Sequence, residues 1–420
     1  MTVIAVDDTD SRERGMCTTY VATRLAEQVR EAGGTVDRTL LVRLNPAVEH
    51  KTRGNAALAV HCDLPAERTL ALADNALDHA ETADPRTNPG AVVVDAAPDA
   101  VPDALADVAR RAVRELLDLD TVRETLSVAG VETVERGMGR GLIGAAAAAG
   151  AHRAFEEWTY ECISYRERDR WGSDREVDVD SVFAAADDAY PEVWDTVDRE
   201  EGVAVCVPRT PCPILHGIRG DDPDAVRRVA ERIESESVAR RHTFRTNQGT
   251  DAHLRDGTID TAQDGRAYRL DGTVAARPDT KEGGHVFFPL EGTGRLQCAA
   301  FEPTKRFRDR VRALREGDRI TACGEVSDGT LKLEKFAVRD CVQTELVTPD
   351  CPDCGRSMKS AGANAGYRCR DCGTDADGKV EQPLDRDIEE GWYEVPPVAR
   401  RHIAKPLVRG GFDAPTHPER

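Results

Sequence analysis

Residues 2–26 read TVIAVDDTDSRERGMCTTYVATRLA, and this stretch decides how the fold begins. The apolar run at 2–6 is typical of a buried strand, and the spacing of apolar residues from 17 to 32 predicts a helix. Asp7, Asp8 and Asp10 fall where the strand ends. Loops at such strand ends commonly bind ligands in open α/β sheets, so these three carboxylates are the first candidates for a functional site.

Clustered carboxylates on one turn suit Mg²⁺, which prefers oxygen ligands and usually holds a nucleotide phosphate as well. The alternative is a solvated acidic turn that caps the next helix. Cys17, Thr18 and Thr19 fall at the start of that helix, where free backbone amides and the helix dipole favour an anion. Carboxylates for a metal and hydroxyls at a helix N-terminus together predict a site that handles phosphate.

Further along the chain, changes in composition and in the hydrophobic pattern predict four domains. Short apolar runs alternate with helical patterns near 66–82 and 102–118, which indicates an α/β domain. The stretch GMGRGLIGAAAAAG at 137–150 is so rich in Gly and Ala that it predicts tight helix packing or a close backbone approach to a ligand. Short alternating segments from 266 to 342 predict a small β-barrel of the OB type. We expect domains at 1–134, 135–260, 261–345 and 346–420.

The strongest metal signal is C-x2-C-x14-C-x2-C, formed by Cys351, Cys354, Cys369 and Cys372. Four thiolates at this spacing predict a structural zinc site with closed coordination; redox-active cysteine pairs are the alternative. Gly355 directly follows one pair, where a tight turn is needed. Of the other cysteines, Cys17 and Cys212 stand beside candidate site residues.

Several other motifs could contribute to a phosphate site. Lys51 and Arg53 in KTRGNAA could neutralise phosphate charge, although such a pair is usually ordinary surface. Asn88 and Gly90 in TNPG form a turn by composition, and Asn88 could line a site. The pattern GxxxxGK[ST] is absent from the sequence, which excludes a P-loop nucleotide site.

The second half of the chain offers candidates for substrate binding. RTPCPILHGIRG at 209–220 and the polar run TNQGTDAHL at 246–254 are dense in polar groups, and Glu161 and Arg166 in TYECISYR are a candidate ion pair. The tail ARRHIAKPLVR at 399–409 has no acid, which predicts a phosphate-contacting segment; a surface helix that neutralises acidic neighbours is the alternative. The substrate-binding candidates are Arg209, His216, Arg219, Arg400, Arg401 and Lys405.

Aromatic residues of the expected barrel could also meet nucleic acid. Phe287, Phe288 and Phe301 are equally compatible with base stacking and with the barrel core.

The composition is that of a protein from a salty cytoplasm. The 420 residues carry a net charge of −19, and 8 of the 57 basic residues are Lys. At molar salt the Debye length falls to about 3 Å, so this charge does not exclude a nucleic-acid partner. The sequence shows neither a signal peptide nor an apolar run long enough to cross a membrane, so we expect a cytoplasmic protein.

The chain contains these motifs in order: VDDTDS, GMCTTYVATRLA, NPAVEHKTRGNAA, TNPG, GRGLIGAAAAAG, TYECISYR, ILHGIRG, TNQGTDAH, the four cysteines and PPVARRHIAKPL. Together they resemble the archaeal 2-agmatinylcytidine synthetases of isoleucine tRNA. The resemblance extends over the whole chain. It implies a multidomain α+β fold with an α/β kinase-like domain, a ferredoxin-like domain, an OB-fold β-barrel and a zinc ribbon. The kinase-like domain would handle ATP and cytidine, and the last two domains would grip tRNA.

The resemblance implies an activity: ATP-dependent attachment of agmatine to the 2-carbon of the wobble cytidine in the isoleucine tRNA with a CAU anticodon. Phosphorylation of the cytidine first would make a leaving group that the amine displaces. Asp7, Asp8 and Asp10 would hold Mg²⁺ and the triphosphate, and Thr18 matches the position that the family autophosphorylates. The remaining nucleotide-binding candidates are Thr9, Ser11, Cys17, Thr19, Lys51, Arg53, Asn88 and Gly90.

The agmatine pocket is expected between the first two domains, and the sequence leaves open which acid binds its guanidinium. The family often has Tyr where His216 stands, so the role of that side chain also stays open.

Two alternatives differ in class. An OB fold with a zinc ribbon also occurs in non-catalytic proteins that bind single-stranded nucleic acid, which would not need the acidic turn or Thr18. A ligase attaching lysine to the same base would carry a Ser-Gly-Gly-x-Asp-Ser loop, which is absent from this sequence.

Overall fold

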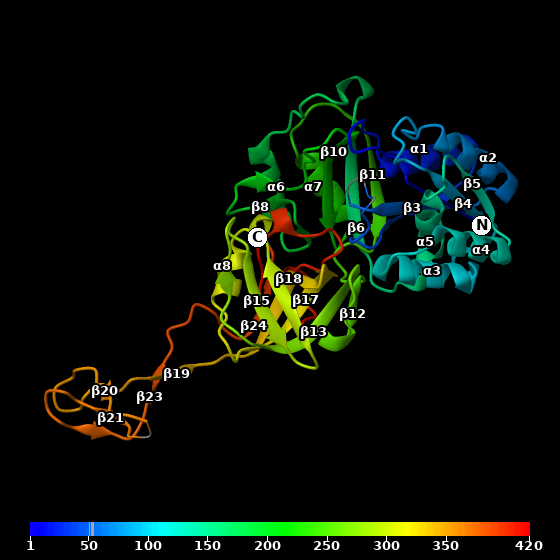
Figure 1. Ribbon diagram of the computed structural model, residues 1–420. Helices are drawn as coiled ribbons and strands as arrows, with labels where there is room; N and C mark the ends of the chain where they lie inside the picture. The colour runs from blue at the N-terminus through cyan, green and yellow to red at the C-terminus, as the bar shows by residue number, and fades with distance from the viewer. Residues whose placement is uncertain (50, 52–53, 364) are drawn as a thin grey trace.

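The computed structural model describes residues 1–49, 51, 54–363 and 365–420, and it confirms a multidomain α+β fold (Figure 1). The N-terminal part is a sheet with strand order β5-β4-β1-β3-β2, in which all neighbours are antiparallel. Its strands are β1 (Thr2–Asp7), β2 (Val36–Arg43), β3 (Ala56–Cys62), β4 (Gly90–Val94) and β5 (Glu132–Glu135).

Helices cover both faces of this sheet because successive side chains of its strands point to opposite sides. Ile4 and Val6 pack under one pair of helices, whereas Val3 and Ala5 pack under the other group. The pair is α1 (Thr18–Glu31) and α2 (Ala66–Leu77), and the group is α3 (Asp103–Arg114), α4 (Leu119–Ala129) and α5 (Gly141–Ala154). Among the described residues, no helix has the length and apolar character that crossing a bilayer requires.

Helix α5 is the Gly- and Ala-rich segment, and it lies very close to the strands. A Cβ at Gly90 or at Gly141 would collide with backbone atoms of the other segment. The tight packing expected from the composition is therefore present. Since α5 packs on the N-terminal sheet, the expected boundary at residue 134 separates it from the strands that it covers; the domain boundaries stay predictions.

The next part has a ferredoxin-like arrangement, with strand order β11-β6-β10-β7 and two helices. Parallel pairing of β11 with β2 joins it to the N-terminal strands, so that one nine-stranded sheet runs through both parts. The elements are β6 (Thr159–Arg166), α6 (Val179–Ala189), β7 (Val193–Trp194), β8 (Val197–Asp198), β9 (Val203–Ala204), β10 (Ile214–Gly220), α7 (Pro223–Arg232) and β11 (Val238–Thr246).

The third part is a closed five-stranded barrel in which β13, β15, β16, β18 and β17 pair in a ring. This is the OB topology that the sequence predicts. Phe288 is in the core, whereas Phe287 and Phe301 are half-buried with their ring centroids 6.0 Å apart. The elements are β12 (Leu254–Asp256), β13 (Arg266–Val274), β14 (Asp279–Thr280), β15 (Val286–Glu291), β16 (Arg295–Ala300), α8 (Phe307–Arg312), β17 (Arg319–Ser327) and β18 (Thr330–Asp340).

The cysteine-rich segment is an excursion from this barrel. It projects on a two-stranded stalk, and the chain then returns to pair with β18 (Figure 1). The stalk is β19 (Thr344–Val347) with β23 (Val380–Pro383); the tip holds β20 (Lys359–Ser360), β21 (Tyr367–Arg368) and β22 (Asp375–Ala376); the returning strands are β24 (Gly391–Glu394) and β25 (Thr416–His417). Short 3₁₀ helices occur at Pro98–Ala100, Arg168–Arg170, Ile259–Thr261, Glu302–Thr304, Pro397–Ala399 and Leu407–Arg409.

A buried ion pair fastens the returning stalk to the barrel. Arg386 donates to the two carboxylate oxygens of Asp318 at 2.7 and 2.6 Å, and both side chains are almost completely buried. Replacing Arg386 with Ala leaves the Asp318 carboxylate buried without its cation. We expect the free energy of unfolding of the barrel, measured by urea titration, to fall by about 3–5 kcal/mol.

The matched control is Arg110→Ala, which removes an exposed ion pair with Asp107 and should cost about 0–1 kcal/mol. Equal effects of the two substitutions would contradict the role given to the Arg386 pair.

Candidate functional site

A cavity of about 740 Å³ lies where the N-terminal part, the ferredoxin-like part and the barrel meet. Its wall includes the end of β1, the start of α1, the end of β2 and the inward faces of β6 and β10. Of the residues predicted from the sequence, the cavity wall includes Asp7, Asp8, Asp10, Cys17, Thr18, Thr19, Lys51 and Arg219.

The three aspartates occupy the turn that follows β1. Asp8 has a positive φ of 58°, which turns the chain sharply at this point. The Oδ2 atom of Asp8 accepts hydrogen bonds from the backbone amide of Asn88 at 3.2 Å and from Arg140 at 2.9 Å. Asp7 lies against the first turn of α5, where a Cβ at Gly144 would overlap its carboxylate. The strand, TNPG and the glycines of α5 thus fix the carboxylates together.

Burial raises the pKa of Asp7 well above its usual range, and the neighbouring charges of Asp8 and Asp10 raise it further. Burial also raises the pKa of Asp8, although Arg140 opposes this effect. A cation would offset the effects that disfavour the charged forms of Asp7 and Asp8, and the carboxylate oxygens of the turn are the donors that Mg²⁺ prefers. The donor set therefore fits the magnesium ion expected from the sequence.

Helix α1 begins at Thr18 on the same side of the cavity. Cys17 occupies the N-cap position without a capping hydrogen bond from its side chain, so it leaves the first amides of the helix to other acceptors. Thr9 donates a hydrogen bond to the Thr18 hydroxyl at 3.1 Å, and the Thr19 hydroxyl lies 3.0 Å from the Cys17 sulfur. Hydroxyls and a positive helix end thus face the acidic turn.

Most of the other residues of the predicted nucleotide site lie behind the cavity wall. Ser11 is buried and donates to Asp84 at 2.7 Å, and Thr9 is buried under Thr18. Asn88 acts on Asp8 through its backbone amide, and Gly90 allows the close approach of α5. Lys51 lines the cavity, and its amine donates to the carbonyl of Pro46. Arg53 lies outside the described residues.

The opposite wall is built around a buried carboxylate that no substrate prediction included. Glu161 accepts a hydrogen bond from Gln248 at 2.5 Å and lies 3.6 Å from both Arg43 and Arg219. Gln248 also accepts from Arg43 at 3.1 Å, while Asn247 bonds the backbone of Arg43. The polar run at 246–254 therefore supports the wall residues Glu161 and Arg43 from behind. The predicted pairing of Glu161 with Arg166 is wrong.

Five of the six predicted substrate residues do not line the cavity: Arg209, His216 and the three cations of the basic tail. Arg209 is exposed in the loop before β10. His216 is buried on the other face of the sheet, because it pairs with Ser164 whereas Gly217 pairs with Ile163 and faces the cavity. Burial lowers the pKa of His216 to about 4, so the ring is neutral near pH 7.

The basic tail is neutralised by acids from distant segments and is not helical over its length. Arg400 is buried between Asp195 and Glu394. The other two predicted cations also have acidic partners: Arg401 binds Glu325 at 2.5 Å and Glu334 at 3.1 Å, and Lys405 lies 3.2 Å from Glu157. These contacts hold the tail to the barrel and the ferredoxin-like part, so its role in RNA binding stays a prediction.

Sequence reasoning missed several wall residues. Arg140 lies in the Gly-rich stretch already suspected of approaching a ligand, so that composition was a usable signal. Arg43 is the last residue of the apolar strand β2, and His402 was noted only as part of the basic tail. Cys17 and Cys212, which the sequence marks for their neighbours, both line the cavity.

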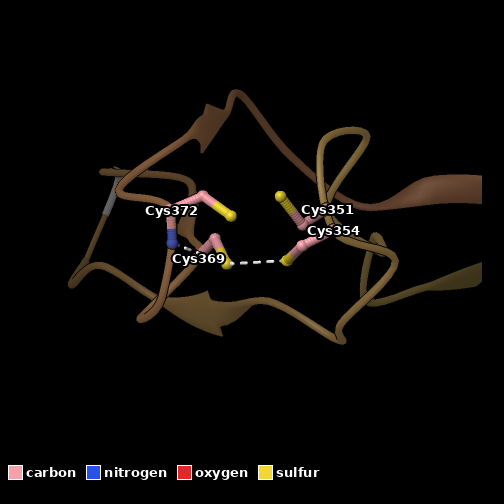
Figure 2. A group of neighbouring side chains, drawn as sticks. All are labelled: Cys351, Cys354, Cys369 and Cys372. Atoms are coloured by element: carbon pink, nitrogen blue, oxygen red, sulfur yellow. Dashed lines mark hydrogen bonds between the residues drawn. The ribbon is translucent and has the colours of Figure 1, made fainter.

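The four predicted metal ligands converge at the tip of the stalk (Figure 2). The sulfur atoms of Cys351, Cys354, Cys369 and Cys372 all lie within 4.8 Å of one another. Gly355, with φ of 70°, donates its amide to the carbonyl of Cys351 at 2.8 Å, as the predicted tight turn requires. Thiolates at such distances fit tetrahedral zinc with bonds of about 2.3 Å.

Models of protein families match three parts of the chain. A TiaS TCKD domain matches residues 3–69, a TiaS FLD domain matches 139–253, and a TiaS C-terminal zinc ribbon domain matches 348–388. The last range contains all four cysteines, so this part of the chain is a zinc ribbon.

Curated relatives and solved structures match the whole chain. The isoleucine tRNA 2-agmatinylcytidine synthetase TiaS of Haloquadratum walsbyi is 52% identical over 100% of both chains, and that of Methanosarcina mazei is 45% identical over 97% of each. A crystal structure of TiaS in complex with an isoleucine tRNA and ATP superposes with a TM-score of 0.91 at 40% identity, covering 100% of this chain and 99% of that one. A complex of TiaS with the tRNA, AMPCPP and agmatine superposes with a TM-score of 0.88 at 37% identity, again covering 100% and 99%. The chain therefore belongs to the TiaS family, the 2-agmatinylcytidine synthetases of isoleucine tRNA.

Proposed function

We propose that this chain is a ligase that forms a carbon–nitrogen bond between agmatine and the 2-carbon of the wobble cytidine in the isoleucine tRNA with a CAU anticodon. The product, agmatidine, would let this tRNA read AUA codons. The observation that carries the proposal is the cavity in which an acidic turn faces the N-terminus of α1. The family relationship supplies the substrates: ATP, tRNA and agmatine occur in the names of the solved relatives.

The chemistry explains why such a cavity is needed. The oxygen on the 2-carbon of cytosine is a poor leaving group, so ATP first phosphorylates it and the agmatine amine then displaces phosphate. Asp7, Asp8 and Asp10 would hold Mg²⁺, which when bound neutralises phosphate charge. Thr18 lies at the helix end, which favours a phosphate, and one of the three aspartates would also take a proton from an attacking group.

The nucleotide-binding roles proposed for Thr9, Ser11, Cys17, Thr19, Lys51, Asn88 and Gly90 divide by position, and the role proposed for Arg53 falls outside the described residues. Cys17, Thr19 and Lys51 line the cavity, whereas Thr9, Ser11, Asn88 and Gly90 support the loop that carries the aspartates. Arg219 is the proposed substrate contact with the best support, since it reaches the cavity wall.

The remaining parts would hold the tRNA. We propose that the zinc ribbon and the barrel bind the tRNA body, with the four parts divided near residues 134, 260 and 345. Because tRNA is its proposed substrate, the protein would act in the cytoplasm.

The first test is direct. The full chain is incubated in high KCl with ATP, Mg²⁺, radiolabelled agmatine and a transcript of the isoleucine tRNA, and the digested tRNA is examined for label. We expect label in the wobble nucleoside, and none in an elongator methionine tRNA or in an isoleucine transcript with uridine at that position. Tight tRNA binding without label would instead favour the non-catalytic alternative.

Two variants test the role of the acidic turn and the role of the zinc ribbon separately. Asp8→Ala removes the carboxylate that Arg140 and Asn88 hold, and we expect labelling to fall by about 100-fold or more while tRNA retention on a filter is unchanged. Cys351→Ser removes a zinc ligand, and tRNA retention should fall first. Asp120→Ala, on the exposed start of α4, is the control. Full turnover by Asp8→Ala would refute the assignment of the acidic turn.

Packing of α5 against Asp7 predicts a third effect. In Gly144→Ala the new Cβ would overlap the Asp7 carboxylate, which must move. A displacement of about 1 Å can cost about 100-fold in rate, so we expect a large loss of kcat/KM with the circular dichroism spectrum retained. Gly378→Ala, where a Cβ meets nothing within 4 Å, is the matched control. Normal activity of Gly144→Ala would show that the position of Asp7 is unimportant.

A further inference from the structure

A second set of hollows lies where β2 and β11 diverge. The two strands pair at Leu40 with Arg245 and at Leu41 with Thr246, and before that point β11 pairs with β6 while β2 pairs with β3. Two adjoining hollows of about 340 and 430 Å³ follow this split and share four lining residues: Arg30, Arg227, His242 and Thr243. We call them the arginine crevice. It shares no lining residue with the site cavity.

The crevice has an excess of positive charge. It is lined by five arginines and only two acids, namely Arg30, Arg38, Arg227, Arg241 and Arg245 against Asp37 and Glu231. Arg38 pairs with Asp37 at 2.7 Å, and Arg227 pairs with Asp224 at 3.6 Å. Within the part of the chain that the structure describes, Arg30, Arg241 and Arg245 form no ion pair with a carboxylate. These three guanidiniums therefore keep donors that no carboxylate of the described residues occupies.

One buried donor accompanies these charges. The Nε atom of Arg245 is buried and has no hydrogen-bond partner among the described residues. Its guanidinium carbon lies 4.9 Å from the centroid of the Trp158 ring, which holds the side chain in place. His242 contacts the hydroxyl of Thr39 at 2.7 Å on the other side of the split. A buried guanidinium nitrogen without an acceptor is costly unless a ligand supplies one.

Arginines of the crevice also lower the pKa values of two nearby histidines. The pKa of His242 is lowered to about 4, chiefly by burial and then by the charge of Arg30. The pKa of His61 is lowered to about 3, again by burial first and then by Arg38. Nearby guanidiniums therefore add to the effect of burial at both rings.

We propose that the arginine crevice is a second binding site, for a phosphate group. Guanidiniums bind phosphate oxygens through paired N–H donors, and the crevice offers several that no carboxylate of the described residues occupies. The phosphate could belong to an RNA backbone or to free phosphate or pyrophosphate, since both present the same oxygens. This site does not depend on the proposed function of the cavity.

The test uses the full chain and inorganic pyrophosphate, titrated calorimetrically at a fixed KCl concentration with a non-hydrolysable ATP analogue present. The variant is Arg30→Gln combined with Arg241→Gln, because both side chains are exposed and should not affect folding; a thermal melt checks this. Arg110→Gln, in an exposed ion pair, is the matched control. We expect the double variant to bind pyrophosphate roughly tenfold or more weakly than the wild type and the control.

A second arm identifies the source of the phosphate. Filter binding of tRNA is measured over a series of KCl concentrations. If the crevice binds an RNA backbone, the double variant loses affinity for tRNA and its salt slope falls by about one for each phosphate that an arginine no longer neutralises. If only pyrophosphate binding falls, the ligand is the free ion. Equal binding of both probes by the wild type and the double variant would overturn the proposal.

Discussion

The short parallel pairing of β2 with β11 is the contact on which the cavity and the arginine crevice both depend. It comprises only two residue pairs, but the side chain of Asn247 extends it. The Asn247 Oδ1 atom accepts from the amide of Arg43 at 2.7 Å, and its Nδ2 atom donates to the Arg43 carbonyl at 3.0 Å. An amide side chain thus continues the strand pairing beyond the end of β11, and Gln248 then reaches Glu161. The two sheets are held as one at the point where the cavity begins.

The two sides of the β2–β11 pairing differ in how the charges of their arginines are compensated. On the cavity side, Arg43 and Arg219 share the buried Glu161, and Arg140 partly offsets the aspartates. Such partly buried pairs persist at high salt, because water and ions do not screen them as they screen exposed charges. On the crevice side, Arg30, Arg241 and Arg245 have no carboxylate partner among the described residues. The proposed phosphate site would supply the anion that these guanidiniums lack.

Local patterns allowed much of the fold to be predicted. Strand β3 coincides with the run AALAVHC, α1 begins within a residue of its expected start, and the cysteine spacing located the ribbon. These features depend on neighbours in sequence. The aspartates of the cavity were predictable for the same reason, since a polar turn after a buried strand is a local signal.

Residues whose environment depends on distant segments could not be predicted in this way. His216 was assigned to the substrate site, but the irregular pairing of β10 with β6 near Ile214 determines which face it occupies. Arg166 was offered as a partner for Glu161, yet five positions along a strand place the two side chains on opposite faces, and Arg166 binds Glu236 at 2.7 Å. The acids that neutralise the basic tail come from segments far away in sequence.

The same tail fastens the barrel to the ferredoxin-like part more extensively than the ribbon is fastened to the barrel. After the zinc ribbon the chain returns to the barrel at β24, and Arg400 and Arg409 then bind Asp195 and Asp221 of the ferredoxin-like part. Buried pairs of this kind fix the barrel against the cavity. The ribbon, by contrast, is joined through two strands and the Arg386 contact (Figure 1). In the proposed function, a ribbon attached in this way would meet the tRNA at a distance from the aspartates, so the tether would separate RNA capture from the geometry of the reaction.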